Sequence, residues 1–122
     1  MSLALTPERL AATYMCLRAF PPFNRIGLPT ADYVEFRVSK DATEHGHYKR
    51  KEPPRHDEHH ISISARNVGH FSSLAWVLGH EMLHLSQALR RTETPNTQHN
   101  AEFHQLAKRA CKQFGWDAKV FA

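Results

Sequence analysis

Three residues near the middle of the sequence have the types and spacing of a metal-dependent hydrolytic site. His80, Glu81 and His84 form an H-E-x-x-H pattern within an apolar run. On a helix, residues four apart lie one turn above each other, so both imidazoles point the same way, with their Cβ atoms about 5–6 Å apart. This spacing lets both imidazoles bind one zinc ion, while Glu81 can contact a water on the metal without being a ligand.

The flanking residues predict that this motif lies in a buried helix from about Phe71 to Arg90. No Lys or Arg occurs between Arg66 and Arg90. Buried imidazoles and a buried carboxylate need partners, and a metal ion would supply them. The alternative is a pair of core histidines satisfied by hydrogen bonds alone. The predicted apolar face of the helix comprises Leu74, Val77, Leu78, Met82, Leu85 and Leu89.

A third metal ligand is expected after this helix, because catalytic zinc usually has three protein ligands and an open fourth position. The candidates are His99, Glu102 and His104, in a helix predicted over residues 98–114. At about 100° per residue, His99 lies about 40° from Phe103 on the apolar stripe, whereas the other two lie about 100° from it on opposite flanks. This placement favours His99 and leaves Glu102 and His104 as alternatives.

The remaining patterns predict a small α+β domain that spans residues 1–122. Thr6-Pro7-Glu8 is typical of a helix start, and Leu10, Tyr14 and Leu17 then repeat at helical spacing as far as Pro21-Pro22. Alternating apolar residues predict strands at 33–39 and 60–66, with Ile61, Ile63 and Ala65 inward, and a further strand at 46–50. We therefore expect an N-terminal helix, a small antiparallel or mixed sheet of about three strands, the H-E-x-x-H helix and a C-terminal helix.

The other histidines and the two cysteines are assigned no chemistry by their spacing. Cys16 and Cys111 lie far apart in helical patterns, which predicts buried free thiols, and no Cys-x-x-Cys pair of a zinc ribbon occurs. Six histidines lack a regular ligand spacing, so solvated surface positions are favoured over a second metal cluster. They are His45, His47, His56, His59, His60 and His70.

Charge and hydropathy indicate where the protein acts. The net charge is +4, and the strongest basic groups are Lys49-Arg50-Lys51 and the set Lys108, Arg109 and Lys112. They predict weak, sequence-independent DNA binding that declines with salt. No apolar run approaches the length of a membrane span, and the first residues lack the layout of a signal peptide, so a cytoplasmic location is expected.

Four segments follow one another along the chain: Gly46-His47-Tyr48, Ile61-Ser62-Ile63, Val77 to His84, and His99-Asn100-Ala101-Glu102-Phe103. In this order they resemble the SprT-like family of minimal zincin metallopeptidases, which includes the Spartan proteases. The last segment resembles the family's H-x-x-x-F element, whose His is the third zinc ligand, and so implies that His99 has this role. The resemblance implies a zinc-dependent endopeptidase with one Zn²⁺ per chain, acting on proteins or peptides, including DNA-associated proteins.

The expected mechanism gives Glu81 the role of general base, which takes a proton from water and passes it to the leaving amine. Candidates to stabilise the oxyanion are Tyr48, His47 and Arg66. The strand ending near Arg66 is expected to form a sheet edge over the cleft and pair with an extended substrate. The alternative function is a non-catalytic, zinc-containing module that binds nucleic acid or a protein. Its structural zinc would need a fourth ligand, such as Glu102 or His104.

Overall fold

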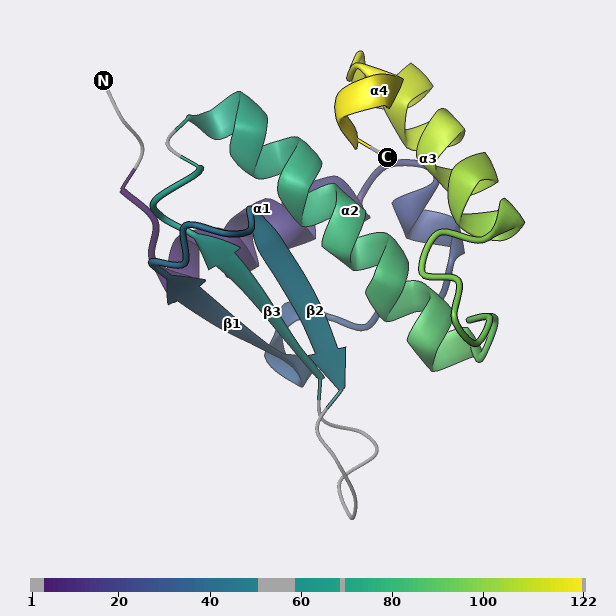
Figure 1. The fold of residues 1–122 in the computed structure, drawn as a ribbon, viewed down its shortest axis with the longest axis horizontal. Coiled ribbons are helices and arrows are strands. Elements are labelled where there is room, and N and C mark those ends of the chain that lie inside the picture. Colours follow the sequence, from purple (N-terminus) through teal and green to yellow (C-terminus); the bar gives the residue numbers. More distant parts are fainter. Residues whose placement is uncertain (1–3, 51–58, 69, 122) are drawn as a thin grey trace.

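The structure is a computed structural model that describes residues 4–50, 59–68 and 70–121. It confirms an α+β fold with an N-terminal helix, a three-stranded sheet and helices after the sheet (Figure 1). Short 3₁₀ turns at Phe23–Arg25 and Ala31–Tyr33 join the first helix to the sheet. The elements are α1 (Pro7–Arg18), β1 (Val34–Ser39), β2 (Gly46–Arg50), β3 (His59–Ser64), α2 (Phe71–Arg90), α3 (Ala101–Phe114) and α4 (Ala118–Phe121).

The sheet is mixed, with strand order β1-β3-β2. β2 pairs antiparallel with β3, and β1 pairs parallel with its other side. Of the two expected arrangements, the mixed sheet is confirmed and the prediction of an entirely antiparallel sheet is wrong. All of β3 is buried because a strand flanks it on each side. The predicted solvent exposure of His59 and His60 is wrong for this reason, since they are 5% and 8% exposed.

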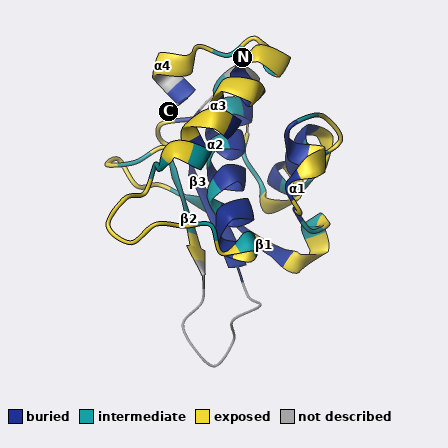
Figure 2. Cartoon of the chain, turned by 90° about the vertical axis from the view of Figure 1, so that its right-hand side faces the viewer, coloured by how far each residue is buried: buried dark blue, intermediate teal, exposed yellow. Residues whose placement is uncertain are grey.

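One face of the sheet packs against α1 and α2. Ile61 and Ile63 are fully buried there, as predicted, whereas Ala65 lies beyond the end of β3 and is exposed. Gly46 brings β2 close to the rest of this layer: a Cβ at this position would lie 2.8 Å from the Ser62 carbonyl oxygen and 3.2 Å from Val77 on α2. α2 is buried along most of its length (Figure 2).

The predicted burial of helical residues is confirmed at most positions, with two exceptions, Cys16 and Leu89. α1 begins as expected, with the Thr6 hydroxyl accepting a hydrogen bond from the Arg9 amide (3.1 Å), and the Leu10–Tyr14–Leu17 stripe is buried. Cys16 lies off that stripe and is exposed, which corrects its predicted burial; Cys111 is buried, and both thiols are free. Leu89, near the end of α2, is 39% exposed, contrary to prediction.

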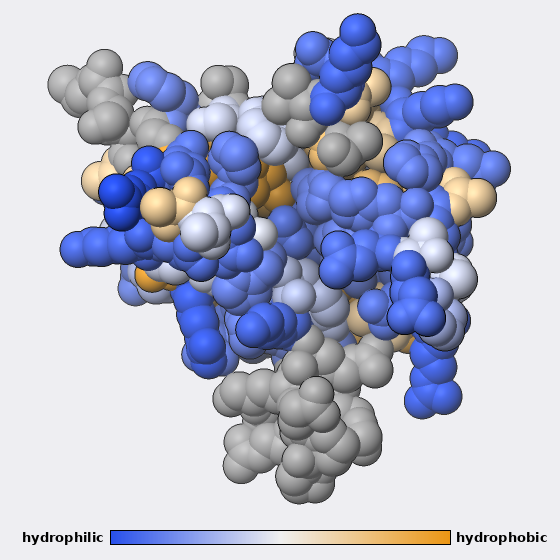
Figure 3. Space-filling view, viewed as in Figure 1, coloured by the Kyte–Doolittle hydropathy of each residue, from blue (hydrophilic) through white to orange (hydrophobic). Residues whose placement is uncertain are grey.

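Hydrophilic residues dominate the face seen in Figure 3. Within residues 4–50, 59–68 and 70–121, no helix combines the length and apolar character needed to cross a lipid bilayer.

Candidate metal centre

Three histidines meet at one point between α2 and the segment before α3. Donor nitrogens of His80, His84 and His99 all lie within 4.8 Å of one another. The Nε2 atoms of His80 and His84 are 3.3 Å apart. Two nitrogens at about 2.0–2.1 Å from a tetrahedral zinc ion are separated by about 3.3 Å, so this spacing already fits a shared ion. The three side chains can therefore hold a metal ion.

His99 is the predicted residue, but it does not lie on the predicted helix. Helix α3 begins at Ala101, and Asn100 is its N-cap, with the side chain accepting a hydrogen bond from the Phe103 amide (3.0 Å). His99 therefore stands in the bend before the helix. Phe103 packs beneath the site, with its ring stacked 4.3 Å from the ring of His99 and 4.8 Å from that of His84. This buried ring orients both imidazoles.

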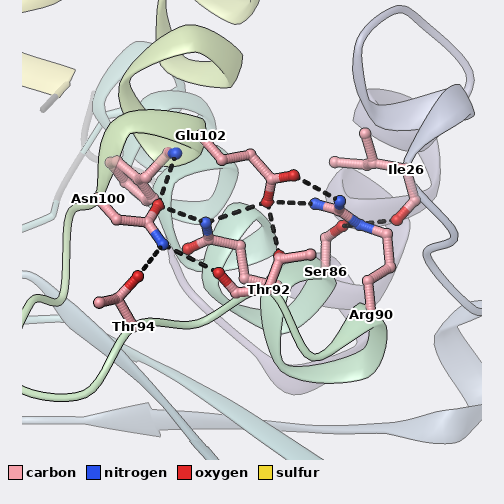
Figure 4. A network of polar contacts seen from close by, with 9 residues as sticks. Ile26, Ser86, Arg90, Thr92, Thr94, Asn100 and Glu102 are labelled. Carbon is pink, nitrogen blue, oxygen red and sulfur yellow. Dashed lines mark hydrogen bonds and ion pairs between the residues drawn. The ribbon is translucent and has the colours of Figure 1, made fainter.

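A polar network joins the end of α2 to the start of α3 (Figure 4). Arg90 donates two hydrogen bonds to the Glu102 carboxylate (2.9 and 3.1 Å), and the Thr92 hydroxyl donates a third (2.6 Å). Gln87 donates to both Glu102 (3.2 Å) and Asn100 (2.8 Å). The hydrogen bonds from Arg90, with those from Thr92 and Gln87, lower the pKa of Glu102 to about 2. The network therefore holds the segment that carries His99.

The two alternative ligands are not part of the histidine cluster. Glu102 uses its carboxylate oxygens in the network, and His104 is exposed on α3, with its ring 6.3 Å from that of His99. Across the part of the chain that the structure describes, no other group of three or more His, Cys, Asp or Glu residues is placed to hold a metal ion. The possible second histidine cluster is thus not formed by the described residues, and His56 lies outside them.

The electrostatic environment keeps the three imidazoles neutral. Burial, with a smaller contribution from the neighbouring His80 and His99, lowers the pKa of His84 to about 3. Burial is also the main cause of the lowered pKa of His80 and of His99. Metal ions bind the neutral imidazole, which has a free lone pair, so the site is prepared for a cation at neutral pH.

Glu81 is buried beside the cluster, with 7% of its surface exposed. Burial, with a smaller contribution from the nearby Glu44, raises its pKa to about 8, while a hydrogen bond from the Tyr48 backbone acts in the opposite direction. A cation bound by the histidines would lower this pKa, because an opposite charge favours the carboxylate. Glu81 is therefore a carboxyl group whose proton affinity depends on the occupancy of the neighbouring site.

A cleft with a volume of about 600 Å³ gives access to these residues, with β2 on one side and residues 93–98 on the other. His47 and Tyr48, two of the predicted oxyanion-stabilising residues, also line it. The His47 ring pairs with Glu44 (2.6 Å), and the Tyr48 hydroxyl contacts the His59 ring. Arg66 is exposed on the turn after β3 and is not among the lining residues.

Two residues that the sequence interpretation did not identify also contact the site. Glu44 lines the cleft and stands two residues before the Gly46-His47-Tyr48 segment, so proximity to that segment was a usable signal. Phe121 reaches the site through its backbone carbonyl, which accepts a hydrogen bond from His80 Nδ1 (2.6 Å). This contact is made by a backbone atom 41 residues after His80, so no pattern of residue types predicts it.

Comparisons of the chain with protein-family models, with curated proteins and with solved structures find no match. What the chain does must therefore be argued from its own residues.

Proposed function

We propose that the chain is a zinc-dependent endopeptidase of the SprT-like kind. The observation that carries this proposal is the convergence of three neutral histidines and one buried glutamate on a single open cleft. Each of these residues belongs to the segments that resemble the SprT-like family. The proposal combines that resemblance with the chemistry that the cleft can support.

The donor set favours zinc as the resident metal. Imidazole nitrogen is a good zinc ligand, and a set of three protein ligands is typical of catalytic sites, whereas structural sites use four. No fourth His, Cys, Asp or Glu joins the cluster within the described residues. This count favours a catalytic site over the structural zinc of a non-catalytic binding module. A zinc ion held there would supply Lewis acidity that polarises a carbonyl and makes a water more acidic.

Glu81 has the position and environment of a general base. Its carboxylate would accept a proton from a water in the cleft and deliver it to the leaving amine nitrogen of the cleaved peptide bond. Burial keeps bulk water from competing for this proton. His47 and Tyr48 stay candidates for the oxyanion contact; His47 contacts Glu44 through Nδ1 and His60 through Nε2, and the Tyr48 hydroxyl contacts His59.

The position of β2 supports an extended peptide as substrate. β3 is the central strand, so the expectation that its edge meets the substrate is wrong; β2 is the strand that lines the cleft. β2 is an edge strand, and an extended chain can add to such an edge as another strand; within β2, the Tyr48 amide already donates to Glu81. Such docking requires a polypeptide, which favours peptide-bond cleavage over the hydrolysis of a small molecule.

Replacing Glu81 tests the proposal. Glu81→Gln keeps the size of the side chain and removes its basicity, so we expect full zinc binding with loss of peptide cleavage by about 10²-fold or more. Zinc content and cleavage of an unfolded protein substrate are measured side by side. Glu8→Gln, an exposed carboxylate on α1, is the charge-matched control and should keep both properties. Activity of Glu81→Gln within a few-fold of the parent would exclude this mechanism.

A further inference from the structure

The C-terminal residues of the described chain pack directly onto one of the three histidines. His80 Nδ1 lies 2.6 Å from the backbone carbonyl oxygen of Phe121, and the Phe121 side chain is 1% exposed. A carbonyl oxygen only accepts hydrogen bonds, so the hydrogen must lie on Nδ1 of His80. In the neutral ring, Nε2 then carries the lone pair, and this is the atom that faces Nε2 of His84.

An aromatic stack holds Phe121 in this place. The Trp116 ring lies between Phe114 (4.6 Å) and Phe121 (5.4 Å) and is nearly parallel to both. The Trp116 amide donates to the Cys111 carbonyl (3.1 Å), which fixes the start of the segment at the end of α3. The position of the Phe121 carbonyl therefore depends on α3 and Trp116 rather than on a free chain end.

Gly79, the residue before His80, allows this stack to close on α2. A Cβ at position 79 would lie 3.0 Å from the Trp116 ring and 3.2 Å from the Phe23 ring. A larger residue would push Trp116 away from α2, and Phe121 with it. Two consecutive residues of α2 thus serve the same contact. Gly79 leaves room for the aromatic stack, and His80 donates a hydrogen bond to the Phe121 carbonyl.

We propose that residues 116–121 are a positioning element for the metal ligand His80. The Phe121 carbonyl selects the tautomer that leaves Nε2 free, and the stack fixes the plane of the ring. Hydrogen bonds of this kind to metal-bound histidines typically change metal affinity by about 10–100-fold. The inference rests on the metal site of the proposed function and does not require peptidase activity.

A purely structural role for this segment makes a different prediction. If Phe121 only fills the core, loss of its contacts lowers the stability of the fold and leaves the His80 tautomer unchanged. A positioning role instead couples the segment to the metal, and by linkage the metal must stabilise the docked segment to the same extent. The tautomer of His80 separates the two roles.

Weakening the single carbonyl acceptor tests the inference without changing any side chain. Cys111 allows the full chain to be assembled by ligating a synthetic peptide of residues 111–122 to residues 1–110. In one version the amide between residues 121 and 122 is replaced by an ester, whose carbonyl is a weaker acceptor. The all-amide product of the same ligation is the matched control. Zinc affinity is measured by competition with a chromophoric chelator, and the His80 tautomer by ¹⁵N chemical shifts in the metal-free protein.

We expect the ester protein to bind zinc about tenfold more weakly and to lose its preference for the Nδ1–H form of His80. Trp116→Ala should weaken zinc binding in the same direction, while Lys119→Ala, an exposed side chain on α4, should not. Zinc affinity within twofold of the all-amide protein, with an unchanged tautomer, overturns the inference. If the all-amide protein binds no zinc, the proposed function fails, and the tautomer in the metal-free protein still decides the role of Phe121.

Discussion

Replacing Glu102 by Gln should destabilise the fold at neutral pH and have little effect in acid. The hydrogen bonds from Arg90, Thr92 and Gln87 lower the pKa of Glu102 from 4.5 to about 2. A difference of one in pKa corresponds to about 1.4 kcal/mol, so the ionised form contributes at most about 3.5 kcal/mol. Because 34% of the side chain is exposed, solvent screens the pair, and we expect about 1–2 kcal/mol.

The direction of the pH dependence follows from the lowered pKa. The folded protein holds the carboxylate more strongly than the unfolded chain, so the contribution is fully present above the unfolded pKa of about 4.5. It is lost as the pH falls toward the folded value of about 2. The difference in unfolding free energy between the parent and Glu102→Gln should therefore narrow steadily below about pH 5.

Urea unfolding of the metal-free proteins from pH 7 to pH 3.5 measures this difference. A chelator removes the contribution of bound metal, and protonation of His80 and His84 affects parent and variant alike, so it cancels. Glu8→Gln is the control for a solvated carboxylate and should stay within about 0.5 kcal/mol of the parent. A Glu102→Gln effect that is equally small at pH 7, or one that does not change with pH, would refute the reasoning.

Three further predictions concern the ligands, the sheet and the basic surface. His99→Ala should lower zinc content from one ion per chain to well below one, while His104→Ala keeps it, as elemental analysis after dialysis can show; equal content in both variants would contradict the ligand assignment. Gly46→Ala should cost about 1–3 kcal/mol in thermal or urea unfolding, because the new Cβ meets backbone at 2.8 Å, and an unchanged midpoint would disprove this close packing. DNA binding should be detectable at low salt, decline steeply toward physiological salt and weaken in Arg109→Glu, which lies on the exposed side of α3; salt-resistant binding would refute a purely electrostatic contact.

The sequence predicted best what depends on local periodicity. The helix around the H-E-x-x-H motif has the predicted bounds, Phe71–Arg90, because its apolar stripe and its lack of internal Lys and Arg mark its extent. His99 was predicted from its angular position on a helix expected over residues 98–114. Helix α3 in fact begins at Ala101, so His99 lies two residues before it. The predicted residue still lies in the histidine cluster, because Phe103 anchors the apolar face against which His99 stacks.

Features that depend on the arrangement of elements were not predictable in this way. Alternation identifies a strand and its inward face but does not reveal its neighbours, so the central position of β3 and the burial of His59 and His60 were missed. The partners of Glu102 come from the end of α2 and the loop after it, which only the packed structure brings together. The hydrogen bond from His80 to Phe121 uses a backbone carbonyl, which every residue type has, so the sequence gives no sign of it.

The location of the three histidines has a consequence for the dynamics of the cleft. Residues 93–98, which form one of its sides, connect the helix of His84 to His99. A metal ion bound to both His84 and His99 would link the two ends of this segment and close it into a ring. This link would reduce the conformational entropy of the loop. Amide hydrogens in this ring should then exchange with solvent more slowly in the metal-bound protein. Metal binding would thus further order residues 93–98 on one side of the cleft, while β2 on the other side is already held by its pairing with β3.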